Sequence, residues 1–334
     1  MITSSSAATA VKPERTAAQH TLAMFPGQGS QRGHMAAHLV REHPRTAGRV
    51  LAAADEVLGL EITELCTTGA EADLARTEIT QPAVLATSLA VLEVLREEGG
   101  FAPSAVAGHS LGEYTALVAA DVLTAADALR LARRRGELMA AVSRRTPGAM
   151  AAVMGLAADR IEELCASSAG DGVVEVANYN EAGQTVVSGN REDVVDLTHR
   201  ALAAGAERTV LLNVSAPFHC SLMREIEDEF AAELAGYTFM DPRSTLLSSV
   251  TGRAVASGDE AKDLLRRQLA SPVRWMDVLG AARQGGITDY VEVGPGRVLS
   301  GFANRSLTDA SVRSTNDARR VATLLRDRPL TPAA

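Results

Sequence analysis

A possible serine nucleophile stands in the run Gly108-His109-Ser110-Leu111-Gly112. In a strand–turn–helix setting this G-x-S-x-G spacing is typical of a nucleophile elbow, because the glycines allow a tight turn that projects the serine hydroxyl. A helix that begins just after Ser110 would direct its positive end and free N–H groups toward a developing oxyanion. The alternative is a glycine-rich turn in which Ser110 only caps the helix.

A serine nucleophile needs a base, and histidine is the first candidate because its pKa lies near neutrality. Among the seven histidines, His219 lies in the loop Ala216-Pro217-Phe218-His219. His109 adjoins the serine, and the same tight turn would direct its side chain away from the hydroxyl. His219 is therefore the candidate base, with an ordinary loop histidine as the alternative.

An arginine also stands where an apolar residue would be expected. On the helix predicted from Thr124 to Val142, Arg135 shares a face with Leu131, Leu138 and Val142. A guanidinium within a core-facing stripe requires an anion from the protein or from a ligand. A buried ion pair with a glutamate is the alternative to a ligand site.

Strands and helices alternate along the chain that carries these residues, which predicts an α/β protein. Apolar runs predict strands at Thr21–Phe25, Ala105–Gly108, Leu246–Val250 and Asp289–Val293. Apolar periodicity predicts helices at Gln81–Glu98, Leu111–Ala120, Thr124–Val142, Leu222–Leu234, Asp263–Leu269 and Val273–Gln284.

Residues 147–213 have a different order of predicted strands and helices, which indicates that they form a small subdomain of their own. The expected elements are a strand at 149–154, a helix at 159–167, strands at 173–177 and 185–188, a helix at 192–204 and a strand at 208–212. This βαββαβ order is the ferredoxin-like pattern. The small unit would interrupt a large α/β subdomain formed by residues 21–146 and 214–306.

Composition excludes several classes of protein. The 334 residues are 46% hydrophobic, which excludes disorder, and 33 basic against 41 acidic residues give a net charge of −8. With only 3% aromatic residues, this charge argues against nucleic acid as a partner. No apolar run approaches the roughly 18 residues of a membrane span. Three cysteines without a C-x-x-C motif fit a reducing cytoplasm.

The two ends of the chain have the composition of tails. Residues 1–20 are rich in serine and alanine and lack the apolar core of a signal peptide, which predicts a disordered leader. Residues 307–334 predict a polar C-terminal tail with at most one short helix near 318–325.

Six motifs in a fixed order resemble a known family. They are FPGQGSQ at Phe25–Gln31, GHSLGEY at Gly108–Tyr114, RG at Arg135-Gly136, PFH at Pro217–His219, QLASPVRW at Gln268–Trp275 and EVGPG at Glu292–Gly296. Together they closely resemble the malonyl-CoA:acyl-carrier-protein transacylases of fatty acid and polyketide synthesis, over residues 22–304. The resemblance implies a hydrolase-like large subdomain with an inserted ferredoxin-like small one.

The resemblance also implies roles for particular residues. Ser110 would be the nucleophile and His219 its general base and acid. A main-chain carbonyl near Gln268 would orient the histidine in place of an acidic triad member. The backbone N–H groups of Gln28 and Leu111 would form the oxyanion hole.

Substrate contacts follow from the same resemblance. Arg135 matches the arginine that pairs with the free carboxylate of malonate, and its bidentate fork suits that partner. Asn178 or Asn180 matches a position that lines the substrate site, and His109 belongs to the same pocket.

The choice of acyl group can be argued from two positions. Family members that select methylmalonate typically have Gln after the serine and Ser before the histidine. Leu111 and Phe218 occupy those positions here. A phenyl ring beside malonyl C2 would crowd a 2-methyl group, at a discrimination of about 1–3 kcal/mol. The pattern therefore favours malonyl.

The implied enzyme is an acyl-carrier-protein S-malonyltransferase that works by a ping-pong reaction. Its partners would be malonyl-CoA, as a substrate, and an acyl carrier protein; no cofactor, metal, nucleic acid or membrane is expected, and the chain would be a monomer. One alternative is an acyl-carrier-protein thioesterase of the same fold, and a second is a non-catalytic docking module. Arg135 argues against the thioesterase, because a hydrolase of neutral acyl chains needs no carboxylate clamp.

Carrier proteins are acidic as a class, so a local basic surface is expected for docking. The densest basic stretch comprises Arg130, Arg133, Arg134, Arg144 and Arg145.

Overall fold

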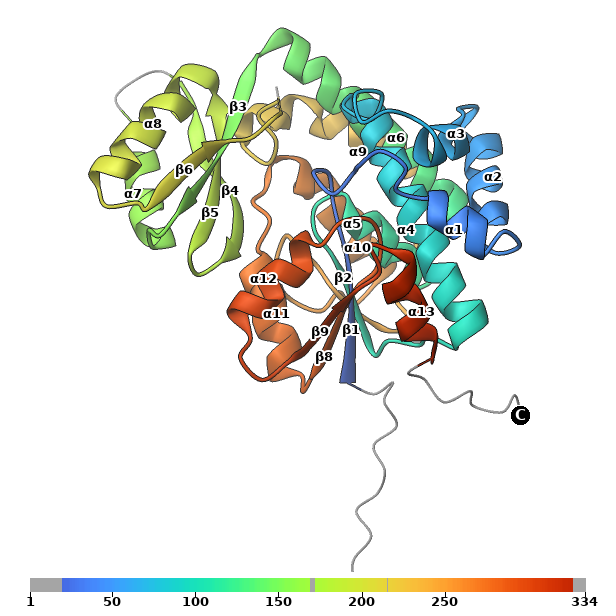
Figure 1. Cartoon of the computed structure of the whole chain (residues 1–334). Coiled ribbons are helices and arrows are strands. Elements are labelled where there is room, and N and C mark those ends of the chain that lie inside the picture. Colours follow the sequence, from blue (N-terminus) through green and yellow to red (C-terminus); the bar gives the residue numbers. More distant parts are fainter. Residues whose placement is uncertain (1–19, 169–171, 215, 327–334) are drawn as a thin grey trace, which may run out of the picture.

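The large subdomain is built on a parallel sheet (Figure 1). The computed structural model describes residues 20–168, 172–214 and 216–326, so the predicted leader lies outside the described residues except for His20. Five strands follow the order β7-β2-β1-β8-β9. Their bounds are β1 Thr21–Phe25, β2 Ala105–Gly108, β7 Thr245–Leu247, β8 Asp289–Glu292 and β9 Ser311–Ser314.

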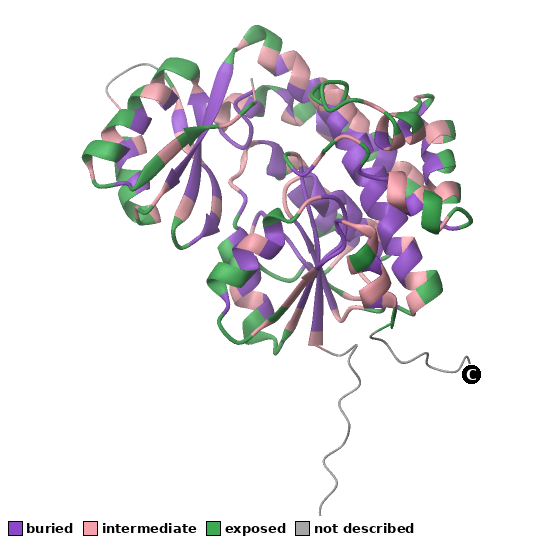
Figure 2. Ribbon diagram, in the orientation of Figure 1, coloured by how far each residue is buried: buried purple, intermediate pink, exposed green. Residues whose placement is uncertain are grey.

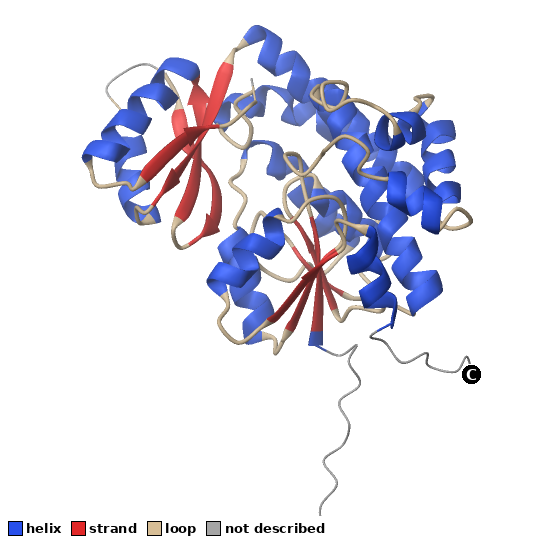
Figure 3. Cartoon of the chain, in the orientation of Figure 1, coloured by secondary structure: helices blue, strands red, loops and turns tan. Residues whose placement is uncertain are grey.

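Helices cover both faces of this sheet (Figure 3). Alternate residues of β1 enter different cores: Ala23 and Phe25 pack with one set of helices, and Leu22 and Met24 with the other. The first set comprises α1 Ala37–Glu42, α2 Ala47–Leu58, α3 Ile62–Thr67, α4 Thr77–Gly99, α5 Gly112–Ala119, α6 Ala125–Arg145, α9 Glu227–Ala235, α10 Gly258–Arg267 and α13 Ala318–Arg326. The second set comprises α11 Trp275–Gln284 and α12 Val298–Ser306. Burial on both faces explains why the central strands β1 and β2 are almost uniformly apolar.

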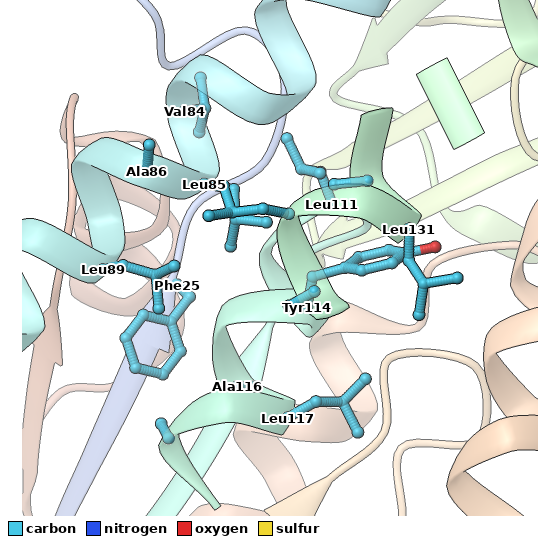
Figure 4. Packing of buried hydrophobic residues seen from close by; sticks show 14 of the residues in the cluster. Phe25, Val84, Leu85, Ala86, Leu89, Leu111, Tyr114, Ala116, Leu117 and Leu131 are labelled. Carbon is cyan, nitrogen blue, oxygen red and sulfur yellow. The ribbon is translucent and has the colours of Figure 1, made fainter. Parts of the chain in front are cut away.

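Helix α4 is the centre of the first core. Its apolar residues include Val84, Leu85 and Leu89, which lie close to Phe25 and to α5 (Figure 4). Length and composition would allow α4 to cross a membrane, but 83% of its apolar window is buried inside the protein. It is the core helix of this subdomain, and Figure 2 shows its middle turns in the colour of buried residues.

The small subdomain is ferredoxin-like, as predicted. Its antiparallel sheet has the order β4-β5-β3-β6. The elements are β3 Gly148–Met154, α7 Ala158–Ala166, β4 Val174–Glu181, β5 Gln184–Asn190, α8 Arg191–Ala203 and β6 Arg208–Leu211. Helices α7 and α8 cover one face of this sheet. The other face turns Met150, Ala152 and Val186 toward the large subdomain.

Backbone hydrogen bonds join the two subdomains near the end of β4. The Tyr179 N–H donates to the Val273 carbonyl at 2.8 Å, and the Val273 N–H donates to the Ala177 carbonyl at 2.8 Å. This short bridge fixes the small sheet beside the segment that leads into α11.

Two expectations from the sequence are wrong. Residues 307–326 are not simply a polar tail, because β9 extends the parallel sheet beside β8; the short helix expected near 318–325 is present as α13, which packs on α4 through Val321 and Leu324. β9 is a half-exposed edge strand with polar residues, so its sequence lacks the apolar run of a central strand. The helix predicted at 222–234 is a 3₁₀ turn at Ser221–Ile226 followed by α9.

Candidate active site

Ser110 lies in a tight turn between β2 and α5, with a φ of +52°. The flanking glycines are required by close backbone contacts. A Cβ on Gly108 would lie 2.0 Å from the Gly112 carbonyl carbon, and one on Gly112 would lie 2.0 Å from the Phe25 oxygen. The strained turn holds the Ser110 hydroxyl at the carboxyl end of the sheet, next to the first turn of α5.

His219 contacts the Ser110 hydroxyl directly. The distance from Ser110 Oγ to His219 Nε2 is 2.7 Å, and His219 Nδ1 lies 3.0 Å from the Gln268 main-chain oxygen. Because a carbonyl can only accept, Nδ1 carries the hydrogen and Nε2 is free to accept the serine proton. The main-chain carbonyl stands where an acidic residue orients the base in other serine enzymes.

The His219 ring is neutral at physiological pH. Burial, with a second contribution from the Arg135 charge, lowers the pKa of His219 to about 3. A neutral imidazole can take a proton from Ser110 without first losing one of its own.

Arg135 extends from α6 to the same hydroxyl, although its side chain is only 2% exposed. Nη2 donates to Ser110 Oγ at 3.1 Å and to Gln268 Oε1 at 3.1 Å, and Nη1 donates to Gln81 Oε1 at 2.9 Å. Burial lowers the pKa of the Arg135 guanidinium. Within the described residues, none of its hydrogen bonds goes to a carboxylate, so the glutamate ion pair considered from the sequence is not formed.

The loop after β1 packs against the nucleophile turn. A Cβ on Gly27 would lie 2.5 Å from the His109 oxygen and 3.6 Å from the Leu111 nitrogen, and the His109 N–H donates to Phe25 at 3.0 Å. This packing places Gly27, the residue before Gln28, beside the Leu111 nitrogen. In the part of the chain that the structure describes, neither the Gln28 nor the Leu111 main-chain N–H donates a hydrogen bond.

These groups open onto a cavity of about 690 Å³ between the two subdomains. Its lining includes Gln28, His109, Ser110, Arg135, Asn178, Asn180, Phe218 and His219. The structure therefore brings eight of the ten predicted site residues to one cavity. Leu111 directs its side chain into the core (Figure 4), and Gln268 lies behind Ser110 and Arg135.

His109 and Asn180 form one wall of the cavity. His109 Nε2 lies 2.9 Å from Asn180 Oδ1, and the Asn180 amide donates to Gln184 at 3.0 Å. Burial lowers the pKa of His109, so the ring is neutral and donates through Nε2. Its ring centroid lies 5.6 Å from that of Trp275. Among the contacts of the described residues, the His109 ring bonds to Asn180 and not to the Ser110 hydroxyl.

Sequence reasoning missed two polar residues behind the cavity. Gln81 holds one arm of Arg135, and the Glu113 carboxylate accepts a hydrogen bond from Gln268. Gln81 is a fully buried amide side chain in α4, and Glu113 lies within the GHSLGEY motif. Both signals were present in the sequence, but only the tertiary contacts show what the side chains hold.

Known proteins resemble this chain over most of its length. Residues 23–332 match the acyl transferase domain family. The chain is 38% identical over 302 residues to the malonyl CoA-acyl carrier protein transacylase of Escherichia coli K12, covering 90% of this chain and 97% of that protein. It is 37% identical over 303 residues to the Staphylococcus aureus MSSA476 protein of the same name, covering 90% and 97%.

Solved structures agree with the sequence matches. FabD from Acinetobacter baumannii matches with a TM-score of 0.89 and 37% identity, covering 93% of this chain and 98% of that one. A malonyl-transacylase solved with its type II PKS acyl-carrier protein, PlMCAT:AntF, matches with a TM-score of 0.89 and 38% identity, covering 92% and 100%. The Ser110 turn, the inserted ferredoxin-like unit and these matches lead to one conclusion: the chain belongs to the acyl transferase family.

Proposed function

We propose that this protein moves a malonyl group from malonyl-CoA to the phosphopantetheine thiol of an acyl carrier protein, by way of an ester on Ser110. The observation that carries the proposal is the Arg135 guanidinium, buried at 3.1 Å from the Ser110 hydroxyl with only neutral hydrogen-bond partners among the described residues. A buried fork of this kind suits a planar carboxylate on the acyl group. The relatives named above supply the substrate class.

In the first half-reaction, Ser110 Oγ attacks the thioester carbonyl while His219 Nε2 takes the hydroxyl proton. The main-chain N–H groups of Gln28 and Leu111 would stabilise the oxyanion. The tetrahedral intermediate then breaks its C–S bond, and His219 returns the proton to the departing CoA thiolate. Arg135 holds the malonyl carboxylate throughout.

The second half-reaction reverses these roles. The carrier thiol gives its proton to His219 and attacks the Ser110 ester. The C–O bond to Ser110 breaks, and His219 returns the proton to the serine oxygen. Both steps are acyl transfers without a change of oxidation state, so the proposed chemistry uses no redox cofactor.

Phe218 and Leu111 support malonyl as the preferred acyl group. Phe218 precedes the His219 base and lines the cavity. Its ring would crowd a methyl substituent on C2, whereas the methylene of malonyl leaves room. His109, Asn178 and Asn180 would complete the wall around the acyl group.

The carrier protein remains the proposed acceptor, but the arginine stretch at 130–145 does not support docking there. Ion pairs engage Arg130 with Asp127, Arg133 with Glu137, Arg134 with Glu229 and Arg145 with Glu225. Acidic neighbours therefore offset most of the positive charge on which that expectation rested.

We place the reaction in the cytoplasm, where the free thiols of Cys66, Cys165 and Cys220 would stay reduced.

One incubation distinguishes the proposed reaction from hydrolysis by a thioesterase. The protein is mixed with malonyl-CoA, with and without a phosphopantetheinylated carrier protein, and the products are followed by mass spectrometry. Transfer to the carrier supports the proposal. Release of free malonate at the same rate with and without carrier would support the thioesterase, and the absence of any acylation would overturn both.

A further inference from the structure

Glu113 is a buried carboxylate next to the nucleophile turn, and the mechanism above does not use it. It lies in the first turn of α5, and its side chain is only 3% exposed. Its carboxylate accepts hydrogen bonds from Ser249 Oγ at 2.7 Å and from Gln268 Nε2. Burial of a carboxylate is unfavourable unless hydrogen bonds compensate it, so its presence here calls for a physical reason.

The Glu113 contact determines which way the Gln268 amide faces. Gln268 Nε2 donates to Glu113 and also to the Ser110 carbonyl at 3.1 Å, while Gln268 Oε1 accepts from Arg135 Nη2 at 3.1 Å. Glu113 Oε2 is the acceptor for both Ser249 Oγ and Gln268 Nε2, and Arg135 can only donate. A flipped amide would therefore place oxygen against oxygen and N–H against N–H.

The same glutamine also orients the base. Its main-chain oxygen lies 3.0 Å from His219 Nδ1. Gln268 thus contacts the nucleophile residue, the base and the carboxylate receptor, and Glu113 is its acidic partner. The Glu113 carboxyl group accepts from the nitrogen of this amide and the Arg135 guanidinium donates to its oxygen, so one amide links two buried polar side chains.

We propose that Glu113 is a positioning residue for acyl transfer, which fixes the Gln268 amide and through it the Arg135 fork. The inference rests on the proposed function, because the fork matters only when the acyl group carries a carboxylate. The competing explanation is purely structural: Glu113 would tie α5 to the segment after β7 through Ser249 and have no effect on the acyl group selected.

A double-mutant cycle separates the two explanations. Glu113→Met removes the carboxylate and keeps the length of the side chain, and Gln268→Ala removes the amide and keeps the main-chain carbonyl. Acylation of Ser110 is measured with malonyl-CoA and with acetyl-CoA in the wild type, both single variants and the double variant. Ser249→Ala is the matched control, because it removes the other hydrogen bond of Glu113 and leaves the Gln268 contact.

We expect Glu113→Met to lower kcat/KM for malonyl-CoA by about 10²-fold, as small displacements of positioning groups do. Acetyl-CoA should lose less, so the malonyl-to-acetyl ratio falls. In the Gln268→Ala background the same substitution should add little, because the amide it positions is already gone. Glu113→Gln, which keeps an acceptor oxygen, should retain more activity than Glu113→Met. Ser249→Ala should keep the wild-type ratio.

Two results would overturn the inference: equal losses from Glu113→Met in both backgrounds, or an unchanged malonyl-to-acetyl ratio in a folded variant. If Glu113→Met does not fold, Glu113→Leu, which also removes the acceptor oxygen, replaces it in the cycle and the same two results decide. The wild-type measurement distinguishes failure of this inference from failure of the proposed function. A wild type that forms no malonyl ester contradicts the function itself.

Discussion

Arg135 Nη2 lies 3.1 Å from Ser110 Oγ, so the proposed carboxylate receptor hydrogen-bonds the proposed nucleophile. This distance limits the length of the acyl group that can use both residues. In malonyl, one methylene separates the carboxylate from the thioester carbonyl, and a receptor beside the attacking oxygen fits that short span. A longer dicarboxylic acyl group would carry its carboxylate past the fork.

The first prediction concerns the covalent intermediate. Brief exposure to malonyl-CoA should leave one malonyl group on Ser110, and Ser110→Ala should lose it. His219→Ala should slow acylation by about 10²–10⁴-fold, the usual contribution of a general base. Intact-protein mass spectrometry with peptide mapping measures both effects. Cys220 is the internal control, since burial raises the pKa of its thiol to about 11 and keeps it unreactive. A label on Cys220 would refute the assignment.

The second prediction concerns pH. Because the pKa of His219 is lowered to about 3, the base stays neutral from pH 8 down to well below its ordinary value of 6.5. The rate of Ser110 acylation, measured as kcat/KM for malonyl-CoA, should therefore show no titration centred near pH 6.5. An acid limb with a midpoint near 6.5 in the folded enzyme would show that the ring is solvated and that its burial is not maintained.

Burial of neutral His219 also affects stability, with a definite sign. Between pH 6.5 and 3 the unfolded chain binds a proton that the folded protein does not, so this residue lowers the free energy of unfolding as the pH falls. Denaturant unfolding at pH 7 and pH 5 should show a smaller loss in His219→Gln than in the wild type. An equal loss in both proteins would contradict the expected pKa.

The third prediction concerns the glycines of the nucleophile turn. Gly112→Ala would place a Cβ 2.0 Å from the Phe25 oxygen, where backbone must shift to make room. We expect a lower melting temperature and loss of acylation. The matched control is Gly280→Ala in α11, where a Cβ meets nothing within 4 Å and should stabilise the helix by roughly 0.5–1 kcal/mol. If Gly112→Ala melts like the wild type, the turn is not as tight as described.

Much of this fold could be predicted from the sequence, because its strands and helices have strong local signals. Strand β2 lies where it was predicted, and α6 begins one residue after the predicted start at Thr124, whose hydroxyl accepts from the Asp127 N–H. β9 could not be predicted, because its polar edge sequence becomes a strand only beside β8. The local sequence pattern of β9 carries no information about its pairing with β8.

The residues of the candidate site likewise fall into two groups: those that the sequence identifies, and those whose roles depend on tertiary contacts. Ser110 and Arg135 were identifiable because each breaks a local pattern, one by its glycine spacing and the other by its charge in an apolar stripe. The roles of Gln81 and Glu113 depend on contacts with residues 54 and 155 positions away. Nothing in a single sequence reports such distant pairings.

The fourth prediction concerns the size of the acyl group. Phe218→Ser removes the ring beside the base and should raise kcat/KM for methylmalonyl-CoA relative to malonyl-CoA. The shift should be about tenfold, within the roughly 1–3 kcal/mol that one methyl group supplies. Competition of the two thioesters in one reaction, read by mass spectrometry of acylated Ser110, measures it directly. An unchanged ratio would mean that Phe218 does not contact C2.

The proposed selection of malonyl depends most on Arg135, and Arg135→Ala tests this selection most directly. Without the fork, the malonyl carboxylate would be desolvated and unpaired, which costs about 2–5 kcal/mol. kcat/KM should be measured for malonyl-CoA and acetyl-CoA in the wild type, in Arg135→Ala and in Arg134→Ala, whose half-buried side chain pairs with Glu229.

We predict that Arg135→Ala lowers malonyl transfer by at least about tenfold, at roughly 1.4 kcal/mol per decade, while acetyl transfer falls much less or rises. Arg134→Ala should leave the ratio of the two substrates unchanged. Circular dichroism verifies that the variants are folded. An equal fall for both substrates in folded Arg135→Ala would contradict the account, because Arg135 would then support the site without selecting the acyl group.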